Sequence, residues 1–140
     1  MRRSWYRAVP ALLGTLAAGP AAAQANGGAA ARSVLDSVYS AEQADRGETV
    51  FSDVCSACHS ASQFRGETFD MNWTSRTLRD LYRLIRTTMP QDSPGRLSDQ
   101  EYIDVVAYLL KLNRYPAGGA DLGSDEQALR RIRIESPPGN

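Results

Sequence analysis

The spacing of apolar residues predicts a first helix that begins at Ser40. Gly47, Phe51 and Cys55 recur at intervals of four residues and therefore share one helical face. Ser40 and Gln43 have the spacing of a capping box, in which two side chains reciprocally satisfy free backbone N–H groups at the start of a helix. The pattern indicates an amphipathic helix that carries Cys55 on its apolar face.

A second helix is predicted from about Arg76 to Thr87. Pro90 disfavours the helical backbone conformation at Met89, so this helix must end near Thr88. Its apolar residues lie on one face and four arginines lie on other faces. The apolar residues are Leu78, Leu81, Tyr82 and Ile85, and the arginines are Arg76, Arg79, Arg83 and Arg86.

The longest helical pattern runs from Asp99 to Leu112. Ser98 and Glu101 form a capping box at its start. Its apolar surface, which includes Tyr102, is so wide that we expect burial on most sides. Ser124 and Gln127 have the same spacing and predict one short helix over residues 124–134. No useful stretch alternates as a strand does, so the sequence predicts an all-α fold of three to four helices without a sheet.

Residues 1–25 have the pattern of a signal peptide that is cleaved during export. Three arginines precede an apolar stretch over residues 8–18, and small residues follow it. Cleavage after Ala25 fits the small-x-small rule, and cleavage after Ala23 is the alternative. The competing interpretation is an uncleaved membrane anchor, which needs about 20 strongly apolar residues, whereas prolines and glycines interrupt this stretch.

The rest of the chain divides into a flexible lead-in over residues 26–39, a main domain over residues 40–113 and a C-terminal extension over residues 114–140. The whole chain has 16 basic and 16 acidic residues. The leader contains three arginines and no acidic residue, so the exported part has 13 against 16, a formal net charge of −3. This balance does not indicate a nucleic-acid partner, which calls for a basic stripe. A domain this small often needs a disulfide, a metal or a cofactor for stability.

The run Cys55-Ser56-Ala57-Cys58-His59 is the pattern of covalent c-type haem attachment. Two thiols three residues apart can reach the two vinyl groups of a haem from one helical turn. His59 follows directly, so its imidazole can ligate the iron from the same side. We therefore expect one haem c, held by thioethers at Cys55 and Cys58, with His59 as the proximal iron ligand.

Three other interpretations of this motif agree less well with the rest of the sequence. A structural zinc site normally uses four Cys or His ligands, and the chain contains two cysteines and one histidine. A thioredoxin-like redox pair lies beside a strand–helix pattern, which the sequence lacks. A disulfide between Cys55 and Cys58 suits an oxidising compartment but leaves the small core unexplained.

With no second histidine in the chain, a methionine is the natural distal ligand, and the exported part contains Met71 and Met89. Met89 follows the end of a helix, is held extended by Pro90 and leads into a turn-rich loop. Met71 has no comparable constraint, and a methionine often only fills gaps in a core. We expect Met89 to be the distal iron ligand, with Met71 or an open site as the alternatives.

On these residues, the main domain resembles the class I mono-haem cytochromes c. The matching features are Gly47 and Phe51 before the haem motif, the run Thr88-Met89-Pro90, and Tyr108 in the last predicted helix of the domain. The resemblance implies that the first and last helices cross near Gly47 and that the helices wrap one covalent haem.

The loop after the motif departs from this class. Many members have a proline there, and its carbonyl group holds the proximal histidine. No proline lies between His59 and Met89, so another backbone group of residues 60–74 must take this role.

Within the class, residues 84–95 and 102–113 are similar to cytochrome domains that accompany pyrroloquinoline-quinone (quinoprotein) alcohol and sugar dehydrogenases. The resemblance implies a periplasmic electron carrier of a Gram-negative bacterium, not itself an enzyme. Its donor would be such a dehydrogenase, of which it could also be the cytochrome subunit, and its electrons would pass towards a respiratory oxidase or another cytochrome. The alternatives are a haem enzyme or gas-binding sensor with an open sixth iron position, and an assembly subunit whose haem only stabilises the fold.

Overall fold

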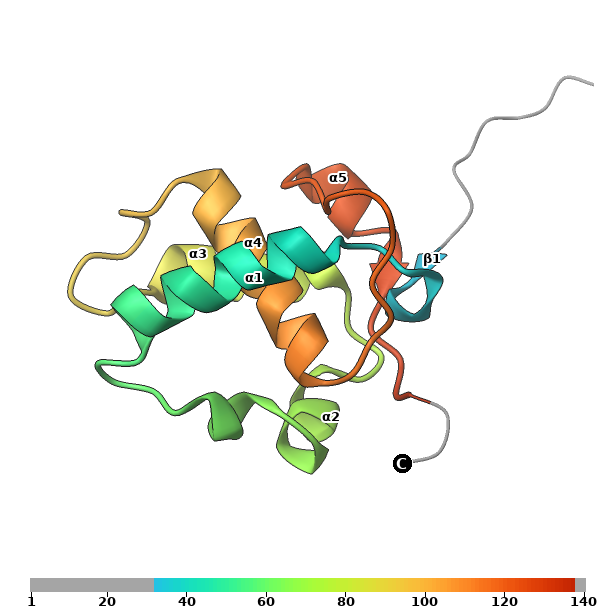
Figure 1. The fold of residues 1–140 in the computed structure, drawn as a ribbon, viewed down its shortest axis with the longest axis horizontal. Coiled ribbons are helices and arrows are strands. Elements are labelled where there is room, and N and C mark those ends of the chain that lie inside the picture. The colour runs from blue at the N-terminus through green and yellow to red at the C-terminus, as the bar shows by residue number, and fades with distance from the viewer. Residues whose placement is uncertain (1–31, 138–140) are drawn as a thin grey trace, which may run out of the picture.

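The computed structural model describes residues 32–137, so the expected signal peptide and its cleavage site lie outside the described residues. The fold is built almost entirely from helices (Figure 1), which confirms the predicted all-α class. Within residues 32–137, no helix is both long and apolar enough to cross a membrane. The elements are β1 (Arg32–Ser33), η1 (Val34–Asp36), α1 (Ala41–Val50), η2 (Phe51–Cys55), η3 (Ala61–Phe64), α2 (Glu67–Trp73), α3 (Leu78–Thr88), α4 (Asp99–Leu112), α5 (Glu126–Leu129) and β2 (Ile132–Arg133).

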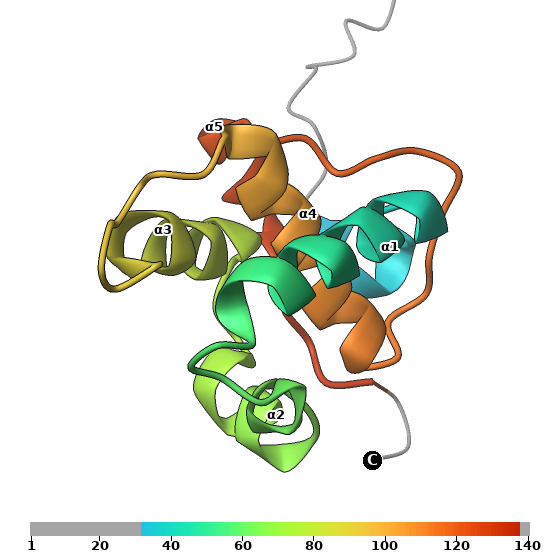
Figure 2. The ribbon, with the colours of Figure 1, turned by 60° about the vertical axis from the view of Figure 1, so that its left-hand side comes forward.

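Helices α1 and α4 cross at close range near the centre of the molecule (Figures 1 and 2). A Cβ atom added at Gly47 would overlap the carbonyl oxygen of Asp104, so only glycine allows the two backbones to approach this closely. Phe51 and Tyr108 pack beside the crossing, with ring centroids 5.4 Å apart. The close crossing predicted at Gly47 is confirmed.

Reciprocal side-chain caps fix where α3 and α4 begin. Ser98 and Glu101 form the capping box that the sequence predicted. Thr77 and Asp80 form a second capping box, which starts α3 two residues after the predicted Arg76. Both helices therefore have their first backbone N–H groups satisfied by neighbours in the sequence.

The capping box predicted at the start of α1 is only half formed. Ser40 accepts a hydrogen bond from the backbone N–H of Gln43 at 3.0 Å. The amide of Gln43 instead pairs with the backbone of Leu122, accepting from its N–H at 2.6 Å and donating to its carbonyl oxygen at 2.9 Å. Gln43 is fully buried, so this long-range pair takes the place of the local one.

The segment over residues 60–74, expected as a loop, contains η3 and α2, and that expectation was wrong. Helix α2 begins after Gly66, whose φ of 63° and ψ of −142° form a backbone conformation that favours glycine. Its main anchor is Phe69, which is buried with its ring centroid 6.3 Å from that of Tyr115. A seven-residue helix with one such anchor leaves no recognisable period in the sequence.

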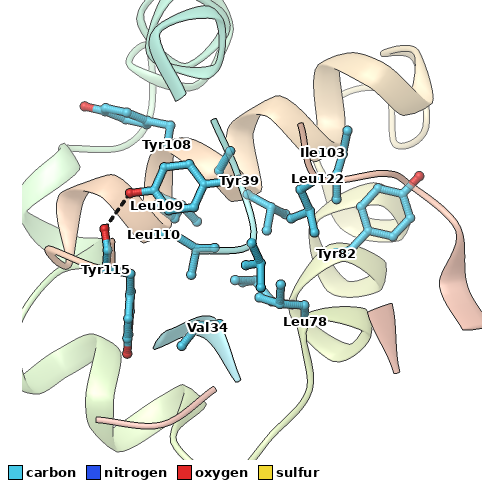
Figure 3. Packing of buried hydrophobic residues seen from close by; sticks show 14 of the residues in the cluster. Val34, Tyr39, Leu78, Tyr82, Ile103, Tyr108, Leu109, Leu110, Tyr115 and Leu122 are labelled. Atoms are coloured by element: carbon cyan, nitrogen blue, oxygen red, sulfur yellow. Dashed lines mark hydrogen bonds between the residues drawn. The ribbon is translucent and has the colours of Figure 1, made fainter. Parts of the chain in front are cut away.

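The C-terminal extension packs onto the main domain. Tyr39 donates a hydrogen bond to the carbonyl oxygen of Tyr115 at 2.7 Å (Figure 3). Leu129, Ile132 and Ile134 are buried in the same core. The helix predicted over residues 124–134 is shorter than expected, because α5 ends at Leu129 and a strand follows it.

The ends of the described chain meet in a two-stranded parallel pairing of β1 with β2. The sequence predicted neither this pairing nor the packing of the segment before α1. Val34, Val38 and Tyr39 are buried, so residues 32–39 are part of the fold rather than of a flexible lead-in. Strands of two residues are too short to show alternation, and they pair only because the tail returns to this position.

Gly47→Ala is expected to lower the free energy of unfolding, because the added methyl group forces α1 away from α4. Overpacking of this kind costs about 1–3 kcal/mol, more than the roughly 1 kcal/mol that alanine gains over glycine in a helix. Unfolding in guanidinium chloride measures the difference. Gly123→Ala is the control, since a Cβ atom there has no neighbour within 4 Å. Equal stability of the two variants would contradict the close crossing.

Candidate haem site

The residues of the haem motif lie on one turn at the end of the first helix. Segment η2 is a single π-helical turn, closed by a hydrogen bond from the backbone N–H of Ser56 to the carbonyl oxygen of Phe51 at 2.8 Å. The backbone N–H groups of Cys58 and His59 both donate to the carbonyl oxygen of Cys55, at 3.1 and 2.9 Å. The structure thus brings the two thiols and the imidazole together on one stretch of backbone.

The two cysteines have different surroundings. Cys55 is half-buried and packs against the hydrophobic core, whereas Cys58 is exposed. Burial raises the pKa of the Cys55 thiol, and the nearby guanidinium group of Arg96 opposes this with a smaller effect. Before any attachment, Cys55 is therefore a neutral thiol held at a fixed position by the core.

The imidazole of His59 packs against an aromatic side chain from the next segment. The rings of His59 and Phe64 meet edge to face, with centroids 5.3 Å apart and an interplanar angle of 69°. Phe64 in turn packs on Phe51, with centroids 5.9 Å apart. This row of rings connects the histidine to the crossing of α1 and α4.

Met89 lies immediately after α3, as the sequence predicted. Its backbone is extended, with φ of −123° and ψ of 151°. The buried phenol of Tyr102, on α4, donates to the carbonyl oxygen of Met89 at 2.7 Å, and the backbone N–H of Leu97 donates to the same phenol at 3.5 Å. Sequence reasoning placed Tyr102 among the apolar residues of its helix and missed this contact, because only the tertiary structure brings the two segments together.

The other methionine of the main domain lies in different surroundings. Met71 is on α2, and 74% of its surface is exposed. Met89 is half-buried beside the packed start of α4. Of the two candidates for the distal iron ligand, Met89 is therefore the one whose backbone is fixed by a tertiary contact.

A cleft of about 310 Å³ opens between α2 and α3. Leu84 lies on its wall, although this large apolar side chain is 50% exposed. The guanidinium group of Arg76 lies 5.5 Å from the centre of the Trp73 ring at the same cleft. The full lining is Gln63, Phe64, Thr68, Phe69, Asn72, Trp73, Arg76 and Leu84.

These residues fit a covalently attached haem. Two free thiols and an imidazole share one turn, and a methionine is presented by an extended segment. The cleft beside Phe64 is lined by three aromatic rings, one leucine, one arginine and three neutral polar side chains. The rings and the leucine suit the apolar plane of a haem, and the arginine suits its carboxylates. A group of this kind would also cover Leu84.

Residues 42–109 match the family model described as cytochrome C oxidase, cbb3-type, subunit III. The matched region begins in α1, includes the haem motif and Met89, and ends within α4. The chain has no significant match among curated proteins or among solved structures.

Tyr102→Phe is expected to lower the free energy of unfolding by about 1–2 kcal/mol, because the Met89 carbonyl group loses its donor and the Leu97 N–H group loses its acceptor. Chemical unfolding measures the loss. Tyr108→Phe, on the same helix, is the control, since the Tyr108 ring packs on Phe51 and away from this loop. A loss no larger than that of the control would show that the phenol does not hold Met89.

Proposed function

We propose that this chain is a periplasmic mono-haem electron carrier with His/Met iron ligation. The match of residues 42–109 to a cytochrome family model supports covalent haem c and electron transfer. In this proposal Cys55 and Cys58 bear the haem thioethers, His59 is the proximal ligand and Met89 is the distal ligand. Domains of this kind carry electrons and do not themselves catalyse a reaction, which supports an electron carrier rather than an enzyme.

One observation carries the assignment of the proximal side. The N–H groups of Cys58 and His59 converge on the single carbonyl oxygen of Cys55, so two covalent anchors and one ligand share a rigid turn. Such a turn suits electron transfer, since the surroundings of the iron need to change little between its two oxidation states.

The assignment of the distal side is supported by the backbone at Met89. Its extended conformation and its hydrogen bond from Tyr102 fix the segment from which the thioether projects. Met71 lies largely in solvent on a short helix. A thioether opposite an imidazole raises the reduction potential and fills both axial positions, which leaves no position for a substrate.

We propose a quinoprotein dehydrogenase as the electron donor and a respiratory oxidase as the acceptor. The likeness of residues 84–95 and 102–113 to cytochromes of quinoprotein dehydrogenases supports such an enzyme as the donor. The family that residues 42–109 match is described as an oxidase subunit, which supports a respiratory oxidase as the acceptor. Cytochrome c domains typically work outside the cytoplasm, and the leader pattern over residues 1–25 supports export to the periplasm.

The structure also distinguishes among the arginines of α3 and its N-terminal flank. Arg79 and Arg83 face Glu126, and Arg86 pairs with Asp99 at 2.7 Å. Arg76 instead lies over Trp73 at the apolar cleft. We propose that Arg76 is the cation for a haem propionate.

The visible spectrum of the ferric protein tests the axial ligands. A low-spin spectrum with the far-red band of methionine-to-iron charge transfer is expected. Met89→Ala should abolish this band, lower the reduction potential and allow exogenous ligands to bind, whereas Met71→Ala should change none of these. A high-spin spectrum of the unchanged protein, or an unaltered potential in Met89→Ala, would overturn His/Met ligation and favour a ligand-binding haem protein.

Arg76→Gln is expected to raise the pKa of the proposed propionate partner, because the ionised form of the propionate loses a nearby cation. The pH range over which the reduction potential varies should then move upward, and the potential itself should fall. Potentiometric titration across pH measures both effects. Arg83→Gln, which removes an exposed arginine of α3, is the control. Identical profiles for the two variants would exclude Arg76 as the propionate partner.

A further inference from the structure

Asn113, the residue that caps the end of α4, makes a clamp on a distant loop. Its side chain is 8% exposed and makes three hydrogen bonds, each of 2.8 Å. The amide nitrogen donates to the carbonyl oxygens of Phe64 and Leu109, and the amide oxygen accepts from the backbone N–H of Gly66. One buried amide thus ties residues 64–66 to the end of α4.

The clamped segment is the junction between η3 and α2. Arg65 and Gly66 are exposed, so core packing does not fix the backbone there. Gly66 has the φ of 63° noted above, which makes this junction a sharp change of direction. The amide of Asn113 therefore supplies a constraint that local sequence does not.

The ring of Phe64 extends from this clamped backbone onto the imidazole of His59. The two rings meet edge to face with centroids 5.3 Å apart, and Phe64 also packs on Phe51. Moving the Phe64 backbone moves the surface against which the imidazole rests. Second-layer contacts of this kind set the orientation of a metal-binding histidine and the properties of its metal.

We propose that Asn113 is a positioning residue that fixes the ring plane of His59 through Phe64. The proposal rests on the proposed function, in which His59 is the proximal iron ligand. In the class I cytochromes, the carbonyl group of a proline after the motif helps to hold the proximal histidine. No proline lies between His59 and Met89 in this chain, and the proposal assigns part of that role to Asn113 at the end of α4.

The test compares Asn113→Ala with Gln43→Ala in the haem-containing protein. Gln43 is a matched control, since it is also a buried amide that clamps a distant backbone, at Leu122, and it lies at the start of α1 away from the motif. Both variants should unfold at lower denaturant concentration. Only Asn113→Ala should change the pattern of hyperfine-shifted haem-methyl resonances, which reports the orientation of the axial imidazole, and lower the reduction potential.

The distal side supplies a second comparison. Exogenous imidazole competes with Met89 for the iron. The affinity of Asn113→Ala for imidazole should therefore stay within about twofold of that of Gln43→Ala. The affinity of Met89→Ala for imidazole should rise strongly. If Asn113→Ala yields no haem protein, Phe64→Leu keeps the clamp, removes the ring contact and should change the same resonances. Asn113→Asp keeps the acceptor for Gly66, loses the donor to Phe64 and sets a carboxylate oxygen against the Phe64 carbonyl oxygen, so it should change the same resonances as Asn113→Ala does.

The two possible failures are distinguishable. A high-spin spectrum of the unchanged protein would overturn the proposed ligation. A low-spin unchanged protein, together with identical haem-methyl patterns in the Asn113 and Gln43 variants, would overturn the role of Asn113 alone.

Discussion

The close crossing of α1 and α4 at Gly47 is the constraint on which the rest of this structure depends. The absence of a side chain at Gly47 lets the backbone of α1 approach the carbonyl group of Asp104, and Phe51 and Tyr108 fill the space beside it. The haem motif follows directly from α1. Because packed helices resist deformation, the position of the motif is set by this crossing rather than by the exposed turn that carries it.

Helix α4 also holds two segments of the candidate haem site. Near its start, Tyr102 holds the carbonyl group of Met89, and after its end Asn113 holds the backbone of Phe64 and Gly66. The two side chains are separated by about 16 Å along the helix axis, at 1.5 Å per residue. One rigid element thus fixes segments that lie on either side of α2 and α3 in the sequence. Helix α4 thus holds two segments of the candidate haem site although it contains none of the expected ligands.

The C-terminal extension completes the core that a small domain needs. Gln43 pairs with Leu122, and Tyr39 donates to Tyr115, so the tail is tied to the segment around the start of α1. Its buried side chains join the same hydrophobic cluster as those of α3 and α4. The C-terminal extension therefore enlarges the hydrophobic core of this small domain, and a bound apolar cofactor would enlarge it further.

The sequence by itself determined the features that depend on near neighbours. The haem motif, the capping box at Ser98 and the end of α3 before Pro90 follow from spacings of a few residues, and the glycine at position 47 indicated the close crossing. Only the tertiary structure decided the contacts of Gln43, Tyr102 and Asn113, since each side chain acts on a backbone group far away in the chain. It likewise decided α2 and the pairing of β1 with β2, which are too short to impose a period on the sequence. A local pattern shows what a residue can bond to, and the fold decides which partner comes within reach.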